Sequence, residues 1–377
     1  MQTTAKLICG PAQSMAGIAD ESVDLIVTSP PYPMVEMWDE IFSRQDEDGR
    51  IGEQLSRGNG QAAFALMHEL LDAVWLECNR VMKPGGIACV NIGDATRTMD
   101  GDFQLYSNHS RILSSFLGQG FAALPDILWR KQTNAPNKFM GSGMLPVGAY
   151  VTYEHEYILV FRKGRRRTFT TAAEKAKRRE SAFFWEERNV WFSDVWLDVK
   201  GTSQGLVDAP TRERSAAFPF ELAYRLICMF SVKEDVVLDP FAGTGTTLAA
   251  ALTAGRNSVG VEIDETLVAV AQDMLRSTRF EANEYNRARL TQHKEWADVR
   301  TTERGPLKYT SRHYGFPVMT AQEQDLLLNE VTGIAGEADG MTLIAQYSEK
   351  PNGLVGEFLS ADGTVGEAPQ MMLPIDC

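Results

Sequence analysis

The stretch VVLDPFAGTGTTLAAALTAGRNSVGVEID, residues 236–264, decides the fold because it reads in order as a strand, a glycine-bearing turn, a helix, a second strand and an acid. Gly243 and Gly245 allow the backbone to turn sharply and to approach a ligand closely, and the free N–H groups at the start of the helix favour electronegative atoms. Glu262 ends the second strand, where an acid can accept hydrogen bonds from both hydroxyls of a ribose. The stretch therefore predicts an open α/β sheet that binds a nucleoside cofactor.

The same stretch argues against two common nucleotide-binding motifs. The dinucleotide fingerprint needs a third glycine at the position of Leu248, and the phosphate-binding loop needs a lysine after Gly245, which is followed here by Thr246. A nicotinamide dinucleotide and a nucleoside triphosphate are therefore both disfavoured as the cofactor.

Apolar runs alternate with helical patterns over the first 280 residues, which is typical of a mostly parallel sheet covered on both faces. The pattern predicts seven strands, at residues 6–9, 24–28, 86–92, 126–129, 156–161, 235–238 and 258–262. Helices are predicted at residues 62–80, 111–117, 220–230, 246–254 and 265–276. The charged, glycine-bearing residues 45–60 predict a mobile loop.

A second stretch, DLIVTSPPYPMVEMWD at residues 24–39, predicts a rigid lip after an apolar strand. Pro30 and Pro31 can continue neither a helix nor a central strand ladder, so the strand must stop and the backbone must run extended. Ser29 and the Tyr32 ring then lie at the carboxyl end of a strand, where open α/β sheets bind ligands. In the alternative structural interpretation, Tyr32 only covers the end of the sheet and Asp239 only caps a helix.

The charge of the chain is unevenly distributed. The 377 residues carry a net charge of −13, which argues against a uniformly basic nucleic-acid-binding surface. Residues 162–180 nevertheless hold nine lysines or arginines against two glutamates. One concentrated basic segment favours contact with a polyanion along a single face, whereas a solvated loop is the alternative interpretation.

Several other classes of protein are disfavoured. The five cysteines include no C-x-x-C pair, and the five histidines show neither H-x-H nor H-E-x-x-H spacing, so neither a disulfide framework nor a metal site is expected. No basic-then-apolar N-terminus and no apolar run of about 18 residues is present, which argues against a signal peptide and a membrane span. A reducing cytoplasm is the expected location.

Residues 24–32 and 236–264 together resemble the paired signatures of amino-group DNA methyltransferases that use S-adenosyl-L-methionine. In the β class of that family the S/D-P-P-Y segment precedes the cofactor segment, as it does here. Further similar stretches are RVMKPGGIACVNIGD, ILWRKQTNAP, HEYILVFRKG and FPFELAYRLI, which begin at residues 80, 127, 155 and 218. The chain departs from the family at Pro11, where members often carry aspartate, and it lacks their histidine before the Phe-Pro pair.

The resemblance implies a Rossmann-like methyltransferase fold with a seven-stranded, mostly parallel sheet in permuted motif order. It divides the chain into a catalytic half at 1–163, a target-recognition insert at 164–214, a cofactor-binding half at 215–285 and a C-terminal appendage at 286–377. The appendage is predicted to be separate, with an acidic helix near residues 321–331 followed by two strands joined by the Pro-Asn-Gly turn at 351–353.

The resemblance also assigns site residues. Catalysis is assigned to Ser29, Pro30, Pro31 and Tyr32. Binding of S-adenosyl-L-methionine is assigned to Phe218, Pro219, Asp239, Pro240, Phe241, Gly243, Gly245, Thr246 and Glu262. Contacts to DNA phosphates are predicted for Arg165, Arg166, Arg167, Arg178 and Arg179, beside a group of aromatic residues (Phe183, Phe184, Trp185, Trp191, Phe192 and Trp196) of which at least half are expected to form the insert's own core. Trp129 and Lys131 are expected to be structural.

The expected reaction is methylation of an amino group on a base that has been flipped out of the duplex. Within the family, Ser-Pro-Pro-Tyr favours cytosine N4 over adenine N6. Methylation of cytosine carbon 5 needs a Pro-Cys nucleophile, which the chain lacks. The alternatives are the adenine-N6 enzyme, a catalytically silent DNA-binding regulator and, more remotely, an RNA methyltransferase. The expected partners are double-stranded DNA with a specific target sequence, a cognate restriction endonuclease acting separately, and a second copy of the chain in a homodimer.

Overall fold

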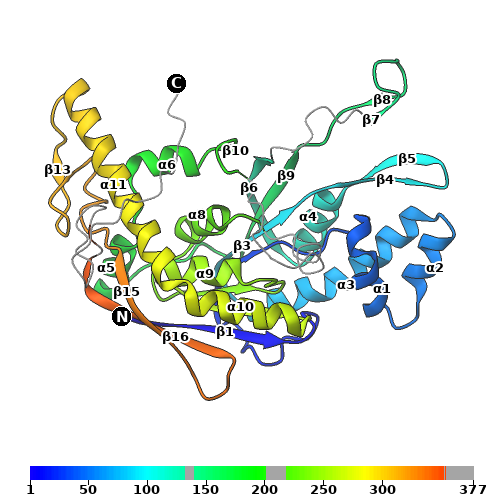
Figure 1. Ribbon diagram of the computed structural model, residues 1–377, viewed down its shortest axis with the longest axis horizontal. Coiled ribbons are helices and arrows are strands. Elements are labelled where there is room, and N and C mark those ends of the chain that lie inside the picture. The colour runs from blue at the N-terminus through cyan, green and yellow to red at the C-terminus, as the bar shows by residue number, and fades with distance from the viewer. Residues whose placement is uncertain (132–139, 201–217, 352, 354–377) are drawn as a thin grey trace.

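The computed structural model describes residues 1–131, 140–200, 218–351 and 353, and it is built around one large sheet (Figure 1). Ten strands follow one another across this sheet in the order β10-β6-β9-β3-β2-β11-β12-β1-β16-β15. Their bounds are β1 Gln2–Cys9, β2 Val23–Thr28, β3 Met82–Ile92, β6 Phe121–Arg130, β9 His155–Lys163, β10 Val195–Trp196, β11 Val236–Asp239, β12 Asn257–Glu262, β15 Asn329–Gly336 and β16 Thr342–Pro351. All seven predicted strands are present, and β10, β15 and β16 extend the sheet at its two sides.

The middle of the sheet is parallel. β3, β2, β11, β12 and β1 pair with their neighbours in parallel, so their carboxyl ends meet at one edge. β9 is antiparallel to both β3 and β6, and therefore its first residues reach that same edge. Three small two-stranded sheets lie outside the main one: β4 Ala95–Met99 with β5 Asp102–Tyr106, β7 Met140–Gly141 with β8 Ala149–Tyr150, and β13 Tyr309–Thr310 with β14 Pro317–Val318.

Helices cover both faces of the sheet. Their bounds are η1 Glu36–Trp38, α1 Asp39–Gln45, α2 Arg50–Ser56, α3 Gly60–Val81, α4 Asn108–Gly118, α5 Ala172–Glu180, α6 Trp185–Trp191, α8 Phe220–Phe230, α9 Thr246–Thr253, α10 Glu265–Ser277 and α11 Arg279–Arg304. Side chains of β2 alternate between the two layers: Ile26 packs with α3 and α4, whereas Leu25 and Val27 pack with α8 and α9. A strand buried on both faces needs an unbroken apolar run, which is why the sequence predicts β2 as a strand.

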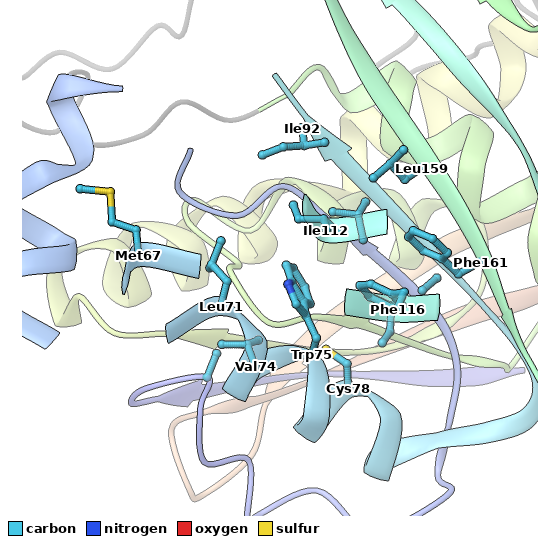
Figure 2. Close-up of a cluster of buried hydrophobic side chains, with 14 of the residues drawn as sticks. Met67, Leu71, Val74, Trp75, Cys78, Ile92, Ile112, Phe116, Leu159 and Phe161 are labelled. Carbon is cyan, nitrogen blue, oxygen red and sulfur yellow. The ribbon is translucent and has the colours of Figure 1, made fainter. Parts of the chain in front are cut away.

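The layer of α3 and α4 is a dense apolar core. In Figure 2, Trp75 of α3 lies beside Phe116 of α4, and Phe116 lies beside Phe161 of β9, while Leu71 and Val74 of α3 lie on the other side of Trp75. The buried residues of α3 recur every three or four positions, which gives the helix one apolar stripe. Trp75 is completely buried, and a large buried aromatic of this kind contributes about 3–5 kcal/mol relative to alanine.

The predicted mobile loop at residues 45–60 is wrong, because it contains α2. Asp46 accepts a hydrogen bond from the backbone N–H of Ile51 in the first turn of this helix, at 2.6 Å. The side chain of Ile51 is buried in the α3 core. One cap and one apolar anchor are therefore enough to order a segment whose composition resembles that of a loop.

The predicted acidic helix near residues 321–331 is also wrong, because the chain makes turns there and enters β15 at Asn329. Asn283 of α11 accepts from the backbone N–H of Val331 at 2.8 Å and donates to its carbonyl at 3.0 Å, which holds the segment extended. The predicted second strand beyond residue 353 lies outside the described residues.

The C-terminal region is not a separate appendage as far as the structure describes it. β16 pairs antiparallel with β1 and so continues the main sheet, while β15 pairs with β16. The predicted boundary at residues 285 and 286 falls inside α11, which packs against α9 and β15. None of the helices that the structure describes is both long and apolar enough to cross a membrane.

Candidate active site

One cavity of about 660 Å³ opens at the edge where the parallel strands end. Its wall includes most of the predicted site residues: Ser29, Pro30, Pro31, Tyr32, Phe218, Asp239, Pro240, Phe241, Gly243, Thr246 and Glu262. The predicted residues Pro219 and Gly245 do not line it. The two stretches that stood out in the sequence, residues 24–39 and 236–264, therefore meet in a single pocket.

A buried carboxylate joins the two halves of this pocket. Asp239, at the end of β11, accepts hydrogen bonds from Thr28 Oγ1 and Thr247 Oγ1, both at 2.6 Å, and from the backbone N–H of Phe241 at 3.0 Å. Burial raises the pKa of Asp239 to about 6, and the three hydrogen bonds oppose that rise. Because Thr28 ends β2, these bonds fix the Pro-Pro segment relative to the glycine-bearing turn.

Glu262 forms the second buried acid of the pocket, at the end of β12. Its Oε2 accepts from the backbone N–H of Gly243 at 2.8 Å, and its Oε1 accepts from that of Asp264 at 2.9 Å. Burial raises the pKa of Glu262. Each carboxylate oxygen can accept more than one hydrogen bond, so Glu262 can still receive two hydroxyl donors from a ligand.

The two glycines of the turn act in different ways. Gly243 has φ 52°, and a Cβ placed on it would have no neighbour within 4 Å, so glycine serves here for its backbone conformation. Gly245 has φ 85°, and its Cβ would lie 3.1 Å from the Cβ of Ala271 in α10. Gly245 therefore allows the close approach of α10 rather than a ligand contact.

On the other side of the pocket, the Tyr32 hydroxyl is the centre of a hydrogen-bond network. It donates to Glu156 Oε2 at 2.9 Å, accepts from Asn91 Nδ2 at 2.9 Å and lies 3.1 Å from Ser29 Oγ. Burial, followed by the nearby charge of Glu156, raises the pKa of Tyr32 well above its ordinary value, so the phenol stays neutral. A Cβ at Gly93 would lie 2.9 Å from the ring, so glycine at this position leaves room for it.

Three residues of this network had no predicted role in the site. Asn91 is the penultimate residue of β3, and Glu156 is the second residue of β9. Lys131, expected to be structural, places Nζ 3.1 Å from Glu156 Oε1. All three line the cavity. The sequence did not reveal that β9 pairs antiparallel with its neighbours, and only this orientation brings Glu156 to the carboxyl edge of the sheet.

The predicted DNA-contacting arginines are not brought to the pocket. Arg167 pairs with Asp235 at 2.7 Å and lies 3.5 Å from Asp24. Asp24 and Asp235 lie at the amino ends of β2 and β11, and β2 spans about 16 Å from Asp24 to Ser29 at 3.3 Å per residue. In Figure 1, α5 accordingly lies near the N-terminus, whereas α1 and α2 lie beyond the carboxyl end of β1.

The other four arginines belong to the same region as Arg167. Arg178 of α5 stacks over the ring of Phe169, as Arg167 does, each guanidinium lying 4.8 Å from the ring centre. Arg165, Arg166 and Arg179 are exposed near them in sequence. Their contact with DNA stays a prediction, and the structure gives it no link to the pocket.

The aromatic residues of the insert divide into two groups. Phe184, Trp191 and Trp196 are buried, whereas Trp185 and Phe192 are exposed. Trp191 and Trp196 pack in the cluster of α8, and Phe184 packs against α11, so they belong to the main body rather than to a core of the insert. Residues 201–214 of the predicted insert lie outside the described residues.

Comparison with known proteins identifies the family. The family model described as DNA methylase, which covers N6 and N4 methyltransferases, matches residues 23–273, more than half of the chain. The chain belongs to this DNA methylase family. The Type II methyltransferase M.MthZI of Methanothermobacter thermautotrophicus is 50% identical over 331 residues, which are 87% of this chain and 91% of the relative. M.MjaI of Methanocaldococcus jannaschii is 47% identical over 286 residues, which are 72% of this chain and 91% of the relative.

A solved structure agrees with this assignment. A protein of Thermus thermophilus, assigned as a DNA modification methylase and crystallised with S-adenosyl-L-methionine, matches with a TM-score of 0.55 and 32% identity. The match covers 72% of this chain and 95% of that protein. As a DNA methylase, this protein uses S-adenosyl-L-methionine as its cofactor and DNA as its substrate.

The residues present fit that cofactor. Glu262 offers two acceptor oxygens for ribose hydroxyls, and Pro11, Ile263 and Leu267 give an apolar wall beside it that suits an adenine ring. The resemblance places Pro11 where family members often carry aspartate, so this wall offers carbon atoms in place of a carboxylate. Asp239 and Phe241 line the same cavity, and Asp239 is hydrogen-bonded to Thr28, the neighbour of Ser29, so they would hold the methyl-bearing end near Ser29.

Proposed function

We propose that the protein is a site-specific DNA methyltransferase that transfers a methyl group from S-adenosyl-L-methionine to the exocyclic N4 of a flipped cytosine. One observation carries the proposal: Ser29 and Tyr32 share a single cavity with Glu262 and Asp239. Ser29 thereby offers an acceptor for an amino group and Tyr32 offers a stacking ring, in the same cavity as the nucleoside pocket beside Glu262.

The pocket residues address the two difficulties of this reaction. An exocyclic amino nitrogen is a poor nucleophile because its lone pair is delocalised into the base, and Ser29 Oγ and the Pro30 carbonyl can accept its hydrogens and draw it out of the ring plane. Extruding the base costs a few kcal/mol, and stacking on the Tyr32 ring returns about 1–3 kcal/mol. When bound, S-adenosyl-L-methionine supplies a methyl group already activated by its sulfonium.

The choice of cytosine rests on Ser29. Within the resembled family, serine before Pro-Pro-Tyr favours cytosine N4, whereas aspartate favours adenine N6. To test this choice, mixed-sequence duplex DNA is methylated with labelled cofactor, digested and read by nucleoside mass spectrometry. N4-methylcytosine is the expected product, with a Tyr32→Ala variant as the inactive control. N6-methyladenine would overturn the cytosine assignment, and DNA binding with no methylated nucleoside would favour the silent regulator.

We further propose that the enzyme is the modification half of a restriction-modification system, since both archaeal relatives are named Type II methyltransferases. Modification of this kind must cover every copy of one short sequence to protect the host. Modified-base sequencing of DNA from a host that expresses the chain checks this, and full modification at a single short site is expected. Partial modification scattered over many sequences would contradict it.

A further inference from the structure

We propose that Glu156 is a positioning residue and the terminal proton acceptor of the base pocket, acting on the target amino group through Tyr32 and Ser29. The proposal rests on the amino-group methylation proposed above and holds for cytosine or adenine. It assigns a role to a buried acid that the cofactor and stacking interactions leave without one.

Glu156 is built into the wall of the cavity and has partners on both oxygens. It is 8% exposed, and its Oε2 accepts from Tyr32 Oη at 2.9 Å and from Asn91 Nδ2 at 2.7 Å. Its Oε1 lies 3.1 Å from Nζ of Lys131, whose side chain is half-exposed. These hydrogen-bond and ion-pair partners satisfy both oxygens of the buried carboxylate and fix its position.

The hydrogens of the network have only one consistent direction. An ionised carboxylate can only accept, so Tyr32 and Asn91 must both donate to Glu156. The single hydrogen of the Tyr32 hydroxyl is then used, and at the contact of 3.1 Å between Tyr32 and Ser29 it is Ser29 that donates. The lone pairs of Ser29 Oγ are thereby left to accept the hydrogens of an amino group. Glu156 thereby determines the direction of both hydrogen bonds, although it bonds Tyr32 and not Ser29 itself.

The orientation of the Asn91 amide agrees with this direction. Its Nδ2 has two hydrogens, and its two nearest acceptors are Glu156 Oε2 at 2.7 Å and Tyr32 Oη at 2.9 Å, whereas Ser29 Oγ is more distant at 3.5 Å. Rotating the amide would place an oxygen 2.7 Å from the carboxylate, where two acceptors repel each other. Among the described residues, Asn91 Oδ1 is a buried acceptor without a hydrogen-bond donor, at the side of the network away from the carboxylate.

The same chain of hydrogens gives the departing proton a route. As the new carbon–nitrogen bond forms, the carbon–sulfur bond breaks with its electron pair on sulfur, and the amino nitrogen must lose one proton. That proton passes to Ser29 Oγ, the Ser29 proton passes to Tyr32 Oη, and the Tyr32 proton passes to Glu156. The base and the sulfur product end neutral, and Glu156 ends protonated beside the half-exposed Lys131, from where the proton returns to water. Because burial disfavours a Tyr32 anion, the protons move together.

The test compares Glu156→Gln with wild type in single-turnover methyl transfer, measured in water and in deuterium oxide. We expect the rate of Glu156→Gln to fall about 100-fold, as for loss of a general base, while the dissociation constants for cofactor and DNA stay within about threefold. The solvent isotope effect of the wild type should disappear in the variant. Glu156→Asp restores the charge and is expected to recover about tenfold of the lost rate.

Glu323→Gln is the matched control, because Glu323 is also a buried carboxylate that accepts two backbone hydrogen bonds, from Trp185 N and Thr320 N, and it does not line the cavity. It should lower stability without changing the rate or the isotope effect. If Glu156→Gln does not fold, Tyr32→Phe breaks the same chain while keeping the ring, and it should slow transfer by at least about tenfold.

A wild-type rate and isotope effect in Glu156→Gln or in Tyr32→Phe would overturn the proposal. Mass spectrometry of the product base in the same assay reads the proposed function separately. If the product is methylated adenine and Glu156→Gln still slows the transfer, only the cytosine assignment is wrong and the role of Glu156 stands.

Discussion

The two edges of the sheet both hold buried acids, but the acids are neutralised in different ways. At the amino edge, Asp24 pairs with Lys83 at 2.7 Å, and Asp235 pairs with Arg167 at 2.7 Å. At the carboxyl edge, Asp239 and Glu262 have no cation partner among the residues the structure describes, and hydroxyls and backbone N–H groups hold them instead. Burial raises the pKa of both. Glu156 lies at the same carboxyl edge but beside a cation, Lys131, so the contrast concerns Asp239 and Glu262. Buried acids without a counter-charge are typical of a functional site.

The largest effect expected from this contrast is at Tyr32. Tyr32→Ala removes the stacking face and breaks the hydrogen-bond chain to Glu156, so the single-turnover rate should fall about 1,000-fold. Calorimetric titration should show cofactor affinity within about twofold of wild type, because the Tyr32 hydroxyl bonds Ser29, Asn91 and Glu156 and not Glu262. Glu262→Ala is the converse variant and should weaken the cofactor by about 10- to 100-fold. If Tyr32→Ala instead weakened cofactor binding and Glu262→Ala instead slowed methyl transfer at unchanged cofactor affinity, the assignments of the base pocket and the cofactor pocket would have to be reversed.

A smaller effect, on the pH dependence of folding stability, is expected from Asp239, which is buried without a cation partner among the described residues. Its pKa rises from 3.8 to about 6 on folding, so the protonated acid favours the folded state. This stability is fully present below about pH 3.8 and is lost as the pH rises through about 6, a total of about 3 kcal/mol.

Asp239→Asn cannot ionise, so wild type should lose stability relative to the variant over this pH range. Urea unfolding at several pH values measures the difference. A constant difference between the two proteins would show that Asp239 is not held in the way described.

At the amino edge, Arg167→Gln should act on stability alone. Arg167 is partly exposed, but its partner Asp235 is buried and also accepts from the backbone N–H of Val232 at 2.8 Å. Removing the guanidinium should lower the free energy of unfolding by about 1–2 kcal/mol and leave methyl transfer unchanged. Lost activity with unchanged stability would make the amino edge part of the site.

The smallest effect is expected from four exposed cations. Replacing Arg165, Arg166, Arg178 and Arg179 by glutamine removes four of the nine cations of the basic segment, and none of the four lines the pocket. Because these residues accompany Arg167 at the amino edge, the slope of log affinity for DNA against log salt should stay the same. A slope reduced by several units would restore the sequence-based prediction that this segment contacts phosphates.

The parts of the site that could be predicted are those encoded over short distances along the chain. A glycine turn, an acid at the end of the next strand, and Ser29 before two prolines each express a local requirement, and parallel pairing of β2, β11 and β12 brings them together. Ser29 and the glycine turn accordingly lie at the same edge of the sheet.

The parts that were missed depend on how distant segments pair. Glu156 reaches the pocket only because β9 runs antiparallel to β3. Turns and the start of β15 replace a predicted helix, because Asn283 holds Val331 extended. The place of the basic segment in the fold also depends on distant partners, because Asp235 and Asp24 determine where Arg167 lies. The contact of this segment with DNA phosphates stays a prediction.

The pairing of β16 with β1 has a consequence for the chain as a whole. Without β16, β1 would be the outermost strand, with a row of open backbone donors and acceptors that other chains could join. Tyr347 holds β16 in place, because its hydroxyl donates a hydrogen bond to the Leu252 carbonyl and is also hydrogen-bonded to Thr3. β15 and β16 therefore protect this edge of the sheet against self-association, and an enzyme shortened before β15 would tend to aggregate.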